Sequence, residues 1–310
     1  MNEDLANCHR SIAPLIHRTP VLTSRLLNQM LGMEVYFKCE NFQRMGAFKM
    51  RGAVYAIQKL STEEKNKGVV THSSGNFAQA LSLAAKSLEI PAYVVMPTNA
   101  PEVKKEAVRS YGGTITECTP DLESRQKTTA AIIAEKGAVF IHPSNDYHVI
   151  LGQGTAAKEL LEDHPDLSFI FVPVGGGGLI AGSCLAAKHF GNQCAVIGGE
   201  PENADDAYRS LKSGKIESNL NPQTIADGLR TELGTINFPI IKGGVKKIIR
   251  VSESEIITAM KLIWERMKIV VEPSSAVALA ALIREKSQYR GARAGIILSG
   301  GNVDLKKLPF

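Results

Sequence analysis

The stretch SFIFVPVGGGGLIAG, residues 168–182, decides the fold class of this chain. It joins an apolar, β-branched run to four consecutive glycines and then to a helix-like segment. Glycine lets the backbone approach a ligand closely, and a helix N-terminus adds partial positive charge. The sequence therefore predicts a strand, a loop and a helix, with the loop either binding an anion such as phosphate or forming a tight structural turn.

Outward from this stretch, short apolar runs alternate with helix-like segments along the chain. This alternation is typical of an α/β protein with parallel sheets, and strands that are apolar throughout indicate sheets covered on both faces. The number of runs is large for one sheet, so we expect two open, twisted, mostly parallel sheets with helices on both faces. The other runs are VYFKC at 35–39, GVVTHSS at 68–74, AYVVMP at 92–97, FIHP at 140–143, AVIGGEP at 195–201, KKIIRVSE at 246–253 and AGIILSGG at 294–301.

Composition excludes several classes of function. The 310 residues carry a net charge of only +5, and the basic residues are scattered, so nucleic-acid and membrane partners are not expected. Residues 167–187 are uncharged over about the length of a membrane span, but their proline and glycines favour a buried strand, loop and helix start. Five cysteines without a C-x-x-C pair, and an N-terminus without an apolar signal segment, indicate a reduced, cytoplasmic protein.

Three further loops carry candidate chemistry. Residues 73–76, SSGN, follow an apolar strand and would either bind a ligand or cap a helix. Lys49, within GAFKMRGA, is either a solvated surface charge or a desolvated amine able to form a Schiff base. The third loop, LSGGN at 298–302, again joins a strand to glycines. A phosphate loop, an imine-forming lysine and two polar loops together suit pyridoxal phosphate.

These motifs resemble those of the fold type II pyridoxal phosphate enzymes, within them the serine racemase and serine/threonine dehydratase family. The resemblance extends from HRTPVLTS at 17–24 to SGGNVDL at 299–305. We expect the cofactor to lie between a large domain, residues 1–65 and 146–310, and a small mobile domain, residues 66–145. The resemblance also implies a homodimer acting on a small amino acid.

The resemblance assigns a role to each motif residue. Lys49 would bind the cofactor covalently, and Ser74 would be the second catalytic group, on the opposite face of the substrate Cα. The cofactor would further contact Phe48, Asn76, Gly175, Gly176, Gly177, Gly178, Gly228 and Ser299. The substrate carboxylate would lie among Ser73, Asn76 and Arg125.

Residues 200–206, EPENADD, match a metal-binding segment of the racemase branch. By that resemblance the side chains of Glu200 and Asp206 and the backbone carbonyl of Ala204 would bind Mg²⁺ or Ca²⁺. Oxygen ligands suit such hard cations. On spacing alone, the same residues read as an acidic helix start.

One position departs from the family pattern, because Phe77 follows SSGN where the family usually has histidine. Arg230 is a possible substitute for the lost polar group, and the preferred substrate is left open. We therefore expect a serine racemase with L-serine and L-threonine dehydratase activity, or an enzyme that is primarily the dehydratase. A β-replacement enzyme of the cysteine synthase type fits less well. A nicotinamide-binding protein stays open on spacing alone, because Glu200 lies where a dinucleotide site needs an acid.

Overall fold

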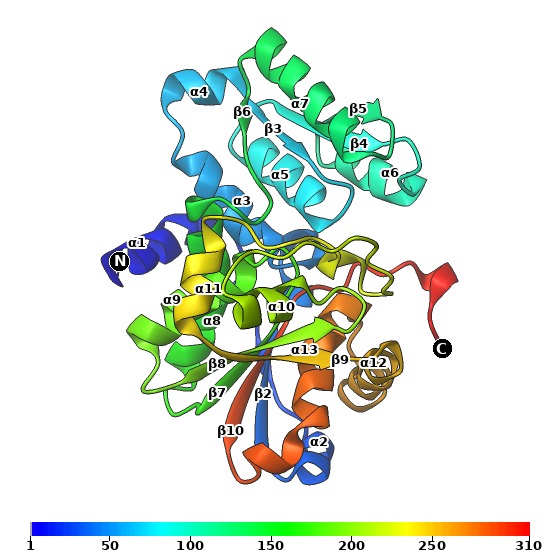
Figure 1. Cartoon of the computed structure of the whole chain (residues 1–310). Coiled ribbons are helices and arrows are strands. Elements are labelled where there is room, and N and C mark those ends of the chain that lie inside the picture. Colours follow the sequence, from blue (N-terminus) through cyan, green and yellow to red (C-terminus); the bar gives the residue numbers. More distant parts are fainter. Residues whose placement is uncertain (1) are drawn as a thin grey trace.

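The computed structural model describes residues 2–310, with side-chain burial described from residue 4 onward. Helices and strands alternate around two separate sheets, which lie one above the other in Figure 1. The strands are β1 (Val21–Leu22), β2 (Glu34–Cys39), β3 (Val69–His72), β4 (Ala92–Pro97), β5 (Thr114–Cys118), β6 (Val139–Phe140), β7 (Phe169–Pro173), β8 (Ala195–Pro201), β9 (Val245–Val251) and β10 (Arg293–Leu298).

The helices pack over both sheets and between them (Figure 1). They are α1 (Asn2–Ile12), α2 (Arg25–Leu31), α3 (Lys49–Gln58), α4 (Thr62–Lys67), α5 (Asn76–Ser87), α6 (Glu102–Ser110), α7 (Leu122–Lys136), α8 (Tyr147–Asp163), α9 (Gly178–Phe190), α10 (Asp206–Ser213), α11 (Asn237–Gly244), α12 (Glu253–Met267) and α13 (Pro273–Arg284). Their ends follow local chemistry: Ser252 and Glu255 form a capping box that begins α12, and Asp146 accepts the first N–H groups of α8.

The larger sheet has the strand order β1-β2-β10-β7-β8-β9, and all its neighbours are parallel except β1 and β2. Alternate residues of β7 point into different cores. Ile170 and Val172 join a core formed with α8 and α9, whereas Phe171 joins a core formed with α12 and α13. Each such buried side chain contributes roughly 1.5–3 kcal/mol, which explains why the strand is apolar at every position.

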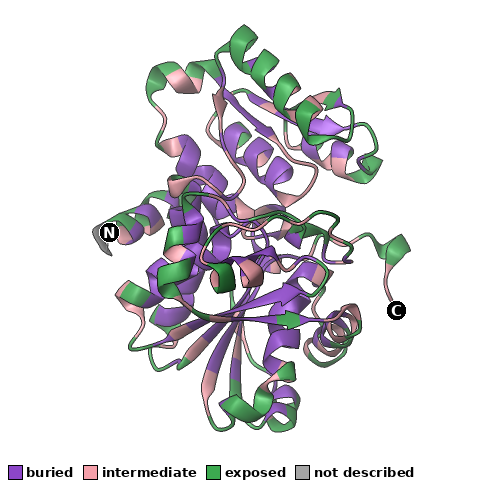
Figure 2. Ribbon diagram, in the orientation of Figure 1, coloured by how far each residue is buried: buried purple, intermediate pink, exposed green. Residues whose placement is uncertain are grey.

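The smaller sheet has the order β5-β4-β3-β6, and all its strands are parallel. It too is covered on both faces. Val95 packs with Ile132 of α7, while Val94 packs with Val108 of α6. Figure 2 shows buried residues in the central strands of both sheets, with partly buried or exposed residues on edge strands such as β5 and β9 and on the outward faces of the helices. The predicted architecture of two mostly parallel sheets is confirmed.

Residues 167–187 form the expected strand, loop and helix start, because β7 ends at Pro173 and α9 begins at Gly178. Over residues 2–310, no helix is both long enough and apolar enough to cross a membrane. Because β10 and β7 are parallel neighbours, the loops after them, at residues 299–301 and 174–177, emerge side by side. The fold thereby brings two of the sequence-predicted loops to one edge of the larger sheet.

Candidate active site

Lys49 is the first residue of α3, and the residue is half-buried. The Nζ atom donates a hydrogen bond to the carbonyl oxygen of Pro143 at 2.7 Å. It also lies 5.0 Å from the ring centre of Phe48 and 5.6 Å from that of Phe77. Burial lowers the pKa of the Lys49 amine to about 8, against an opposing effect of the Glu272 charge. The amine is therefore much closer to its neutral, nucleophilic form than an exposed lysine.

The glycine loop is close-packed on every side. A Cβ atom at Gly176 would lie 2.5 Å from Ser144 Oγ, and one at Gly175 would lie 2.7 Å from the Cα of Leu229. Gly177 has a φ of 80°, a left-handed conformation that side-chain-bearing residues rarely adopt. Only glycine satisfies this combination of crowding and backbone angle.

A buried side chain orients that loop. Asn237 Nδ2 donates to the carbonyl oxygen of Gly176 at 2.8 Å and to that of Ser144 at 3.2 Å. The first turn of α9, which begins at Gly178, has N–H groups without intrahelical acceptors. With a carbonyl turned toward Asn237 and the helix N-terminus next to it, the loop has the chemistry of an anion cradle.

Ser299 lies beside Lys49 at the end of β10. Its carbonyl oxygen accepts the N–H of Phe48 at 3.0 Å, which fixes the two segments to each other. Its hydroxyl is buried and lies 3.1 Å from Ser275 Oγ. Ser275 also exchanges hydrogen bonds with the backbone of Gly300. The Ser299 hydroxyl is thus held in place and suits a weak partner such as a ring nitrogen.

Asn76 extends from the smaller sheet's first helix toward a buried carboxyl. Its Nδ2 atom lies 3.0 and 3.2 Å from the two oxygens of Glu272, and its Oδ1 atom accepts from Asn302 at 2.9 Å. Burial, followed by the Asp227 charge, raises the pKa of Glu272 to about 7, and the bond from Asn76 opposes that rise. Glu272 was not among the sequence-predicted residues, because an acid before Pro273 reads as an ordinary helix start.

The SSGN segment does not cap its helix with serine, because the N-cap of α5 is Gly75. Ser73 Oγ accepts the N–H of Gly75 at 3.3 Å, and Ser74 lies half-buried at the end of β3. Burial lowers the pKa of His72, the last residue of β3, and the charge of Arg125 on α7 adds a smaller effect in the same direction. The Nε atom of Arg125 is buried, and within residues 2–310 it has no hydrogen-bond partner.

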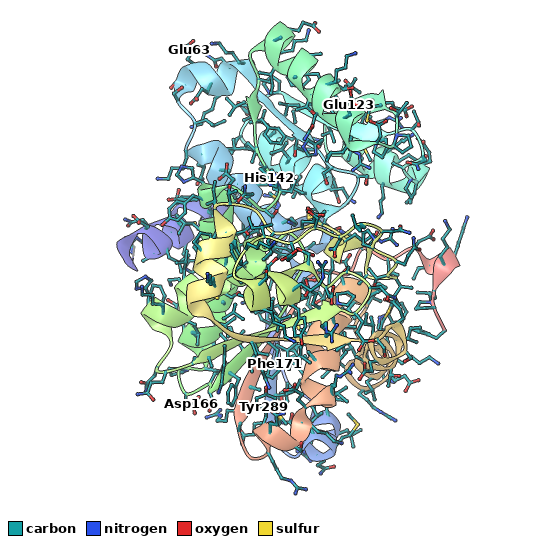
Figure 3. The ribbon with its side chains drawn as sticks, in the orientation of Figure 1. Glu63, Glu123, His142, Asp166, Phe171 and Tyr289 are labelled. Atoms are coloured by element: carbon teal, nitrogen blue, oxygen red, sulfur yellow. The ribbon has the colours of Figure 1, made fainter. Side chains whose placement is uncertain are left out.

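His142, labelled in Figure 3, lies where the part of the chain containing β3–β6 meets the part containing the larger sheet. Its Nδ1 atom accepts the N–H groups of Ser144 at 3.1 Å and Asn145 at 2.8 Å, so the neutral ring carries its proton on Nε2. Burial, and then the charges of His72 and Lys49, lower the pKa of His142 to about 4. Sequence analysis did not select it, although it follows a strand end as the selected loops do.

Gly228 lies against the glycine loop: its carbonyl oxygen is 3.0 Å from where a Cβ of Gly175 would be, and its N–H donates to Ser274 Oγ at 3.1 Å. The Arg230 guanidinium instead donates to the backbone oxygen of Thr224, at 3.1 Å from Nε and 2.5 Å from Nη2. The guanidinium of Arg230 therefore stabilises its own loop.

The proposed metal-binding segment forms a separate cluster at the end of β8. The Glu200 carboxylate accepts the N–H groups of Ala207 at 3.0 Å and Tyr208 at 2.8 Å. Asp206 accepts the N–H of Leu233 at 3.0 Å. Burial, followed by the Asp206 charge, raises the pKa of Glu200 well above its usual value, and burial raises that of Asp206 to about 6. Across the described chain, no three His, Cys, Asp or Glu side chains form a metal-binding group.

Two buried carboxyls that repel each other are suited to a hard cation, since a cation would relieve the repulsion and leave further coordination positions to water. Ala204, whose N–H bonds to the carbonyl of Pro201 at 3.0 Å, lies in the turn between them. The donor chemistry fits Mg²⁺ or Ca²⁺, although the protein side chains supply only two ligands.

An anion cradle, a lysine of lowered pKa and a buried serine hydroxyl on a neighbouring loop have the chemistry that a phosphorylated aldehyde cofactor needs. Residues 12–300 match the family of pyridoxal-phosphate dependent enzymes. The chain belongs to this family, and its cofactor is pyridoxal phosphate.

Individual relatives match over nearly the whole chain. A beta-hydroxyaspartate dehydratase of Paracoccus denitrificans is 50% identical over 308 residues, covering 99% of this chain and 98% of the relative. A serine racemase of Dictyostelium discoideum is also 50% identical, over 310 residues and covering 99% and 96%. The crystal structure of a serine racemase from Dictyostelium discoideum superposes with a TM-score of 0.94, covering 98% of this chain and 99% of that one at 50% identity.

The lowered pKa of Lys49 leads to a pH prediction. A lysine amine must lose its proton before it attacks an aldehyde, and this amine does so near pH 8. The rate at which cofactor-free protein takes up pyridoxal phosphate should rise about tenfold per pH unit below 8 and level off above it. Stopped-flow absorbance measures this rate. A profile that keeps rising to pH 10 would show that the amine is solvated.

Proposed function

We propose that this enzyme is a serine racemase that also deaminates L-serine and L-threonine: the β-hydroxyl leaves as water, and hydrolysis of the dehydrated product then consumes one water and releases the oxo acid and ammonia. The observation that supports it most is 50% identity, over nearly the full length, to proteins named as a serine racemase and as a beta-hydroxyaspartate dehydratase. Both reactions begin by removing the proton from the substrate Cα. They differ in whether a proton returns to Cα or the β-hydroxyl departs.

When bound, pyridoxal phosphate supplies an aldehyde for amines and a ring that withdraws electrons from Cα. In our proposal the loop of Gly175–Gly178 binds its phosphate, and the Ser299 hydroxyl accompanies the pyridine nitrogen. A hydroxyl, unlike a carboxylate, does not require that nitrogen to be protonated. Ser299 would therefore leave the bound ring a weaker electron acceptor, and this would favour prompt proton return or prompt loss of a β-hydroxyl.

The proton steps belong to two side chains of unlike kind. Lys49 takes the Cα proton on one face, and the hydroxyl of Ser74 exchanges a proton with Cα on the other. Ser73, Asn76 and Arg125 bind and orient the substrate carboxylate. Phe48 backs the cofactor ring, and Gly228 leaves room at its other face.

A panel of amino acids tests the proposal. Serine and threonine are incubated without an added thiol, oxo acid release is measured, and the remaining serine is separated by chirality. We expect pyruvate from serine, 2-oxobutanoate from threonine, and appearance of D-serine. Product formation that needs a thiol would instead identify a β-replacement enzyme of the cysteine synthase type.

A second candidate, a primary dehydratase of β-hydroxy amino acids, is favoured by two observations. The relative from Paracoccus denitrificans is named for beta-hydroxyaspartate, and the Nε of Arg125 is buried without a partner. A guanidinium with a free donor suits a carboxylate. Adding 3-hydroxyaspartate to the panel separates the candidates: a kcat/KM far above that for serine supports this second one.

We propose that Glu200, Asp206 and the Ala204 carbonyl bind Mg²⁺ or Ca²⁺. An ion at 100 times its dissociation constant would stabilise the fold by about 2.7 kcal/mol, so Mg²⁺ should raise the melting temperature of the wild type and chelator should lower it. Replacing Glu200 and Asp206 together by alanine should abolish both shifts. The exposed Glu202, changed to glutamine, is the control and should retain them. Equal melting of the wild type with and without chelator argues against a bound ion.

We also propose a homodimer in the cytoplasm with a movable small domain, residues 66–145. The five cysteines of the whole chain are buried and free, which suits a reducing compartment. The ion pair of Lys104 with Asp227, 2.7 Å long, joins α6 of the small domain to the loop beside Gly228 and would have to break on opening. Light scattering would measure the mass of the particle and so test the dimer. Cell fractionation would test the compartment. Small-angle scattering with and without substrate would test the movement of the small domain.

A further inference from the structure

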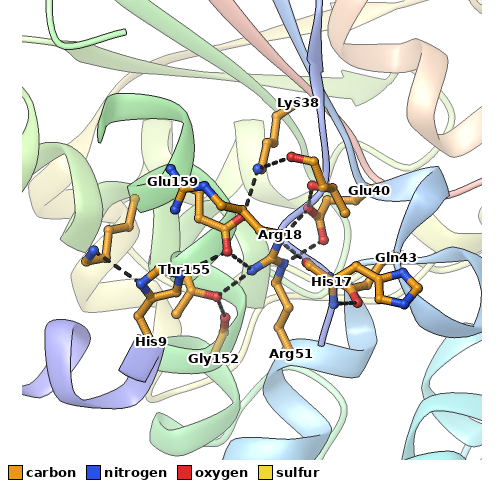
Figure 4. A network of polar contacts seen from close by, with 12 residues as sticks. His9, His17, Arg18, Lys38, Glu40, Gln43, Arg51, Gly152, Thr155 and Glu159 are labelled. Atoms are coloured by element: carbon orange, nitrogen blue, oxygen red, sulfur yellow. Dashed lines mark hydrogen bonds and ion pairs between the residues drawn. The ribbon is translucent and has the colours of Figure 1, made fainter. Parts of the chain in front are cut away.

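A buried ionic network surrounds a side chain of α3, the helix that begins at Lys49 (Figure 4). Its centre is Arg51, two residues after Lys49 on α3 and fully buried. The guanidinium binds Glu40 through Nε at 2.7 Å and Nη2 at 2.8 Å, and binds Glu159 through Nη1 and Nη2, both at 2.8 Å. Nη1 also donates to Thr155 Oγ1 at 3.1 Å. Paired bonds to two carboxylates fix the plane of the guanidinium as well as its position.

The network is balanced in charge. Lys38, fully buried on β2, lies 2.7 Å from Glu159, so two buried cations face two buried carboxylates. His9 of α1 also contacts Glu159, at 2.9 Å. Burial lowers the pKa of Arg51, but the charges of Glu40 and Glu159 together raise it by more, so the charged form is retained. Buried pairs of this kind are often no more stabilising than apolar side chains of equal size, so stability alone is a weak explanation for the network.

Beside Arg51, helices α3 and α8 touch backbone to backbone. A Cβ atom at Gly152 would lie 2.5 Å from the Cα of Gly52. This contact sets the distance between the helices, and apolar side chains such as Val54 of α3 and Ile150 of α8 pack in one core beside it. The bonds from Arg51 to Glu159 and Thr155, both on α8, add a directional restraint on the rotation of α3 about its axis.

Rotation of α3 matters because of where Lys49 points. Residues two apart in an α-helix lie about 200° apart around the axis, so Lys49 and Arg51 occupy nearly opposite faces. The acceptor of the Lys49 amine, the carbonyl of Pro143, lies just before α8 begins at Tyr147. Donor and acceptor are therefore carried by the two segments that Arg51 joins.

We propose that Arg51 is a positioning residue for Lys49: its bonds to Glu40 and Glu159 set the rotation of α3 and so direct the lysine amine into the cofactor site. This inference rests on Lys49 being the cofactor-bearing lysine. Arg51 itself, on the far side of the helix, touches neither cofactor nor substrate.

Arg51→Lys in the holoenzyme tests the proposal, because it keeps the charge and removes the paired bonds. We expect kcat per bound cofactor to fall about tenfold to 10²-fold with KM nearly unchanged, since small misplacements of a reacting group cost this much. The visible circular dichroism of the bound cofactor, divided by its absorbance, should also change, because it reports the orientation of the ring in its site. A merely stabilising residue would leave both quantities at wild-type values.

Lys38→Met is the matched control, since it breaks the same network from β2 without touching α3. It should lower the melting temperature yet keep kcat per bound cofactor and the dichroism of the wild type. Wild-type values in Arg51→Lys, or equal losses in the two variants, would overturn the proposal. If Arg51→Lys does not fold, Thr155→Val is the alternative, because it removes one hydrogen-bond acceptor of the Arg51 guanidinium. It should shift kcat per bound cofactor and the dichroism slightly, in the direction expected for Arg51→Lys. No shift in Thr155→Val would also overturn the proposal.

Attachment of the cofactor to Lys49 can be tested separately. Borohydride reduction of the wild-type holoenzyme followed by peptide mapping should find the cofactor on Lys49. Attachment to another lysine would contradict the proposed function. Attachment to Lys49, together with wild-type kcat and dichroism in Arg51→Lys, would contradict only the positioning role of Arg51.

Discussion

Lys49→Ala should lose the covalently held cofactor and more than about 10³-fold of turnover, because one amine is both the anchor and the first base, and a positioned base alone contributes about 10²–10⁴-fold. The structure supports this dual role through the lowered pKa of the amine and its bond to the Pro143 carbonyl. Absorbance of the cofactor before and after borohydride, together with oxo acid release from serine, measures the two losses.

Lys59→Ala is the matched control for this variant. Lys59 is exposed at the other end of the same helix, where its amine lies 4.9 Å from the ring centre of Tyr55. It should retain both the coloured cofactor and turnover. A Lys49→Ala protein that still yields a reduced cofactor–lysine adduct and wild-type turnover would place the anchor at another residue.

Structural features formed by residues adjacent in the sequence were predictable. The β7 strand, the four glycines and the start of α9 follow one another over residues 168–182, and local propensities suffice to identify them. The small and apolar neighbours of Lys49 in GAFKMRGA made it a candidate, but a solvated surface charge stayed open until the family resemblance assigned it a role. Both sheets followed from the recurrence of apolar runs, since a parallel sheet covered by helices requires strands that are apolar on both faces.

Features that depend on distant partners were not predictable. Glu272 meets Asn76 across 196 positions, and neither position signals the other. The acceptor of Lys49 is the backbone carbonyl of Pro143, a group that every residue type possesses. Arg51 reads as one more charged residue of a helix until the fold brings Glu40 and Glu159 around it. In each case tertiary burial, and not local sequence, gives the polar group its role.

Ser74→Ala should separate the two proposed activities. Ser74 is placed opposite Lys49 in our proposal, so its loss removes the group that delivers a proton to the second face of Cα. Elimination from L-serine needs only Lys49 to take the Cα proton, and the phosphate of the cofactor, when bound, would supply an acidic group near the departing hydroxyl. L-serine elimination should therefore persist at least in part. Racemisation, and elimination from D-serine, should fall by about 10²-fold or more.

Solvent deuterium incorporation at Cα, followed by chiral separation of the recovered serine, measures this separation directly. Ser110→Ala, an exposed serine at the end of α6, is the control and should leave both activities unchanged. The structural ground for the prediction is that Ser74 lies half-buried at the end of β3 while Gly75 holds the cap position of α5, so the hydroxyl is not needed to begin the helix. If Ser74→Ala interconverts L- and D-serine at the wild-type rate, the second proton donor is another group at this edge of the smaller sheet. The neutral ring of His142, which carries its proton on Nε2, is then the next residue to replace.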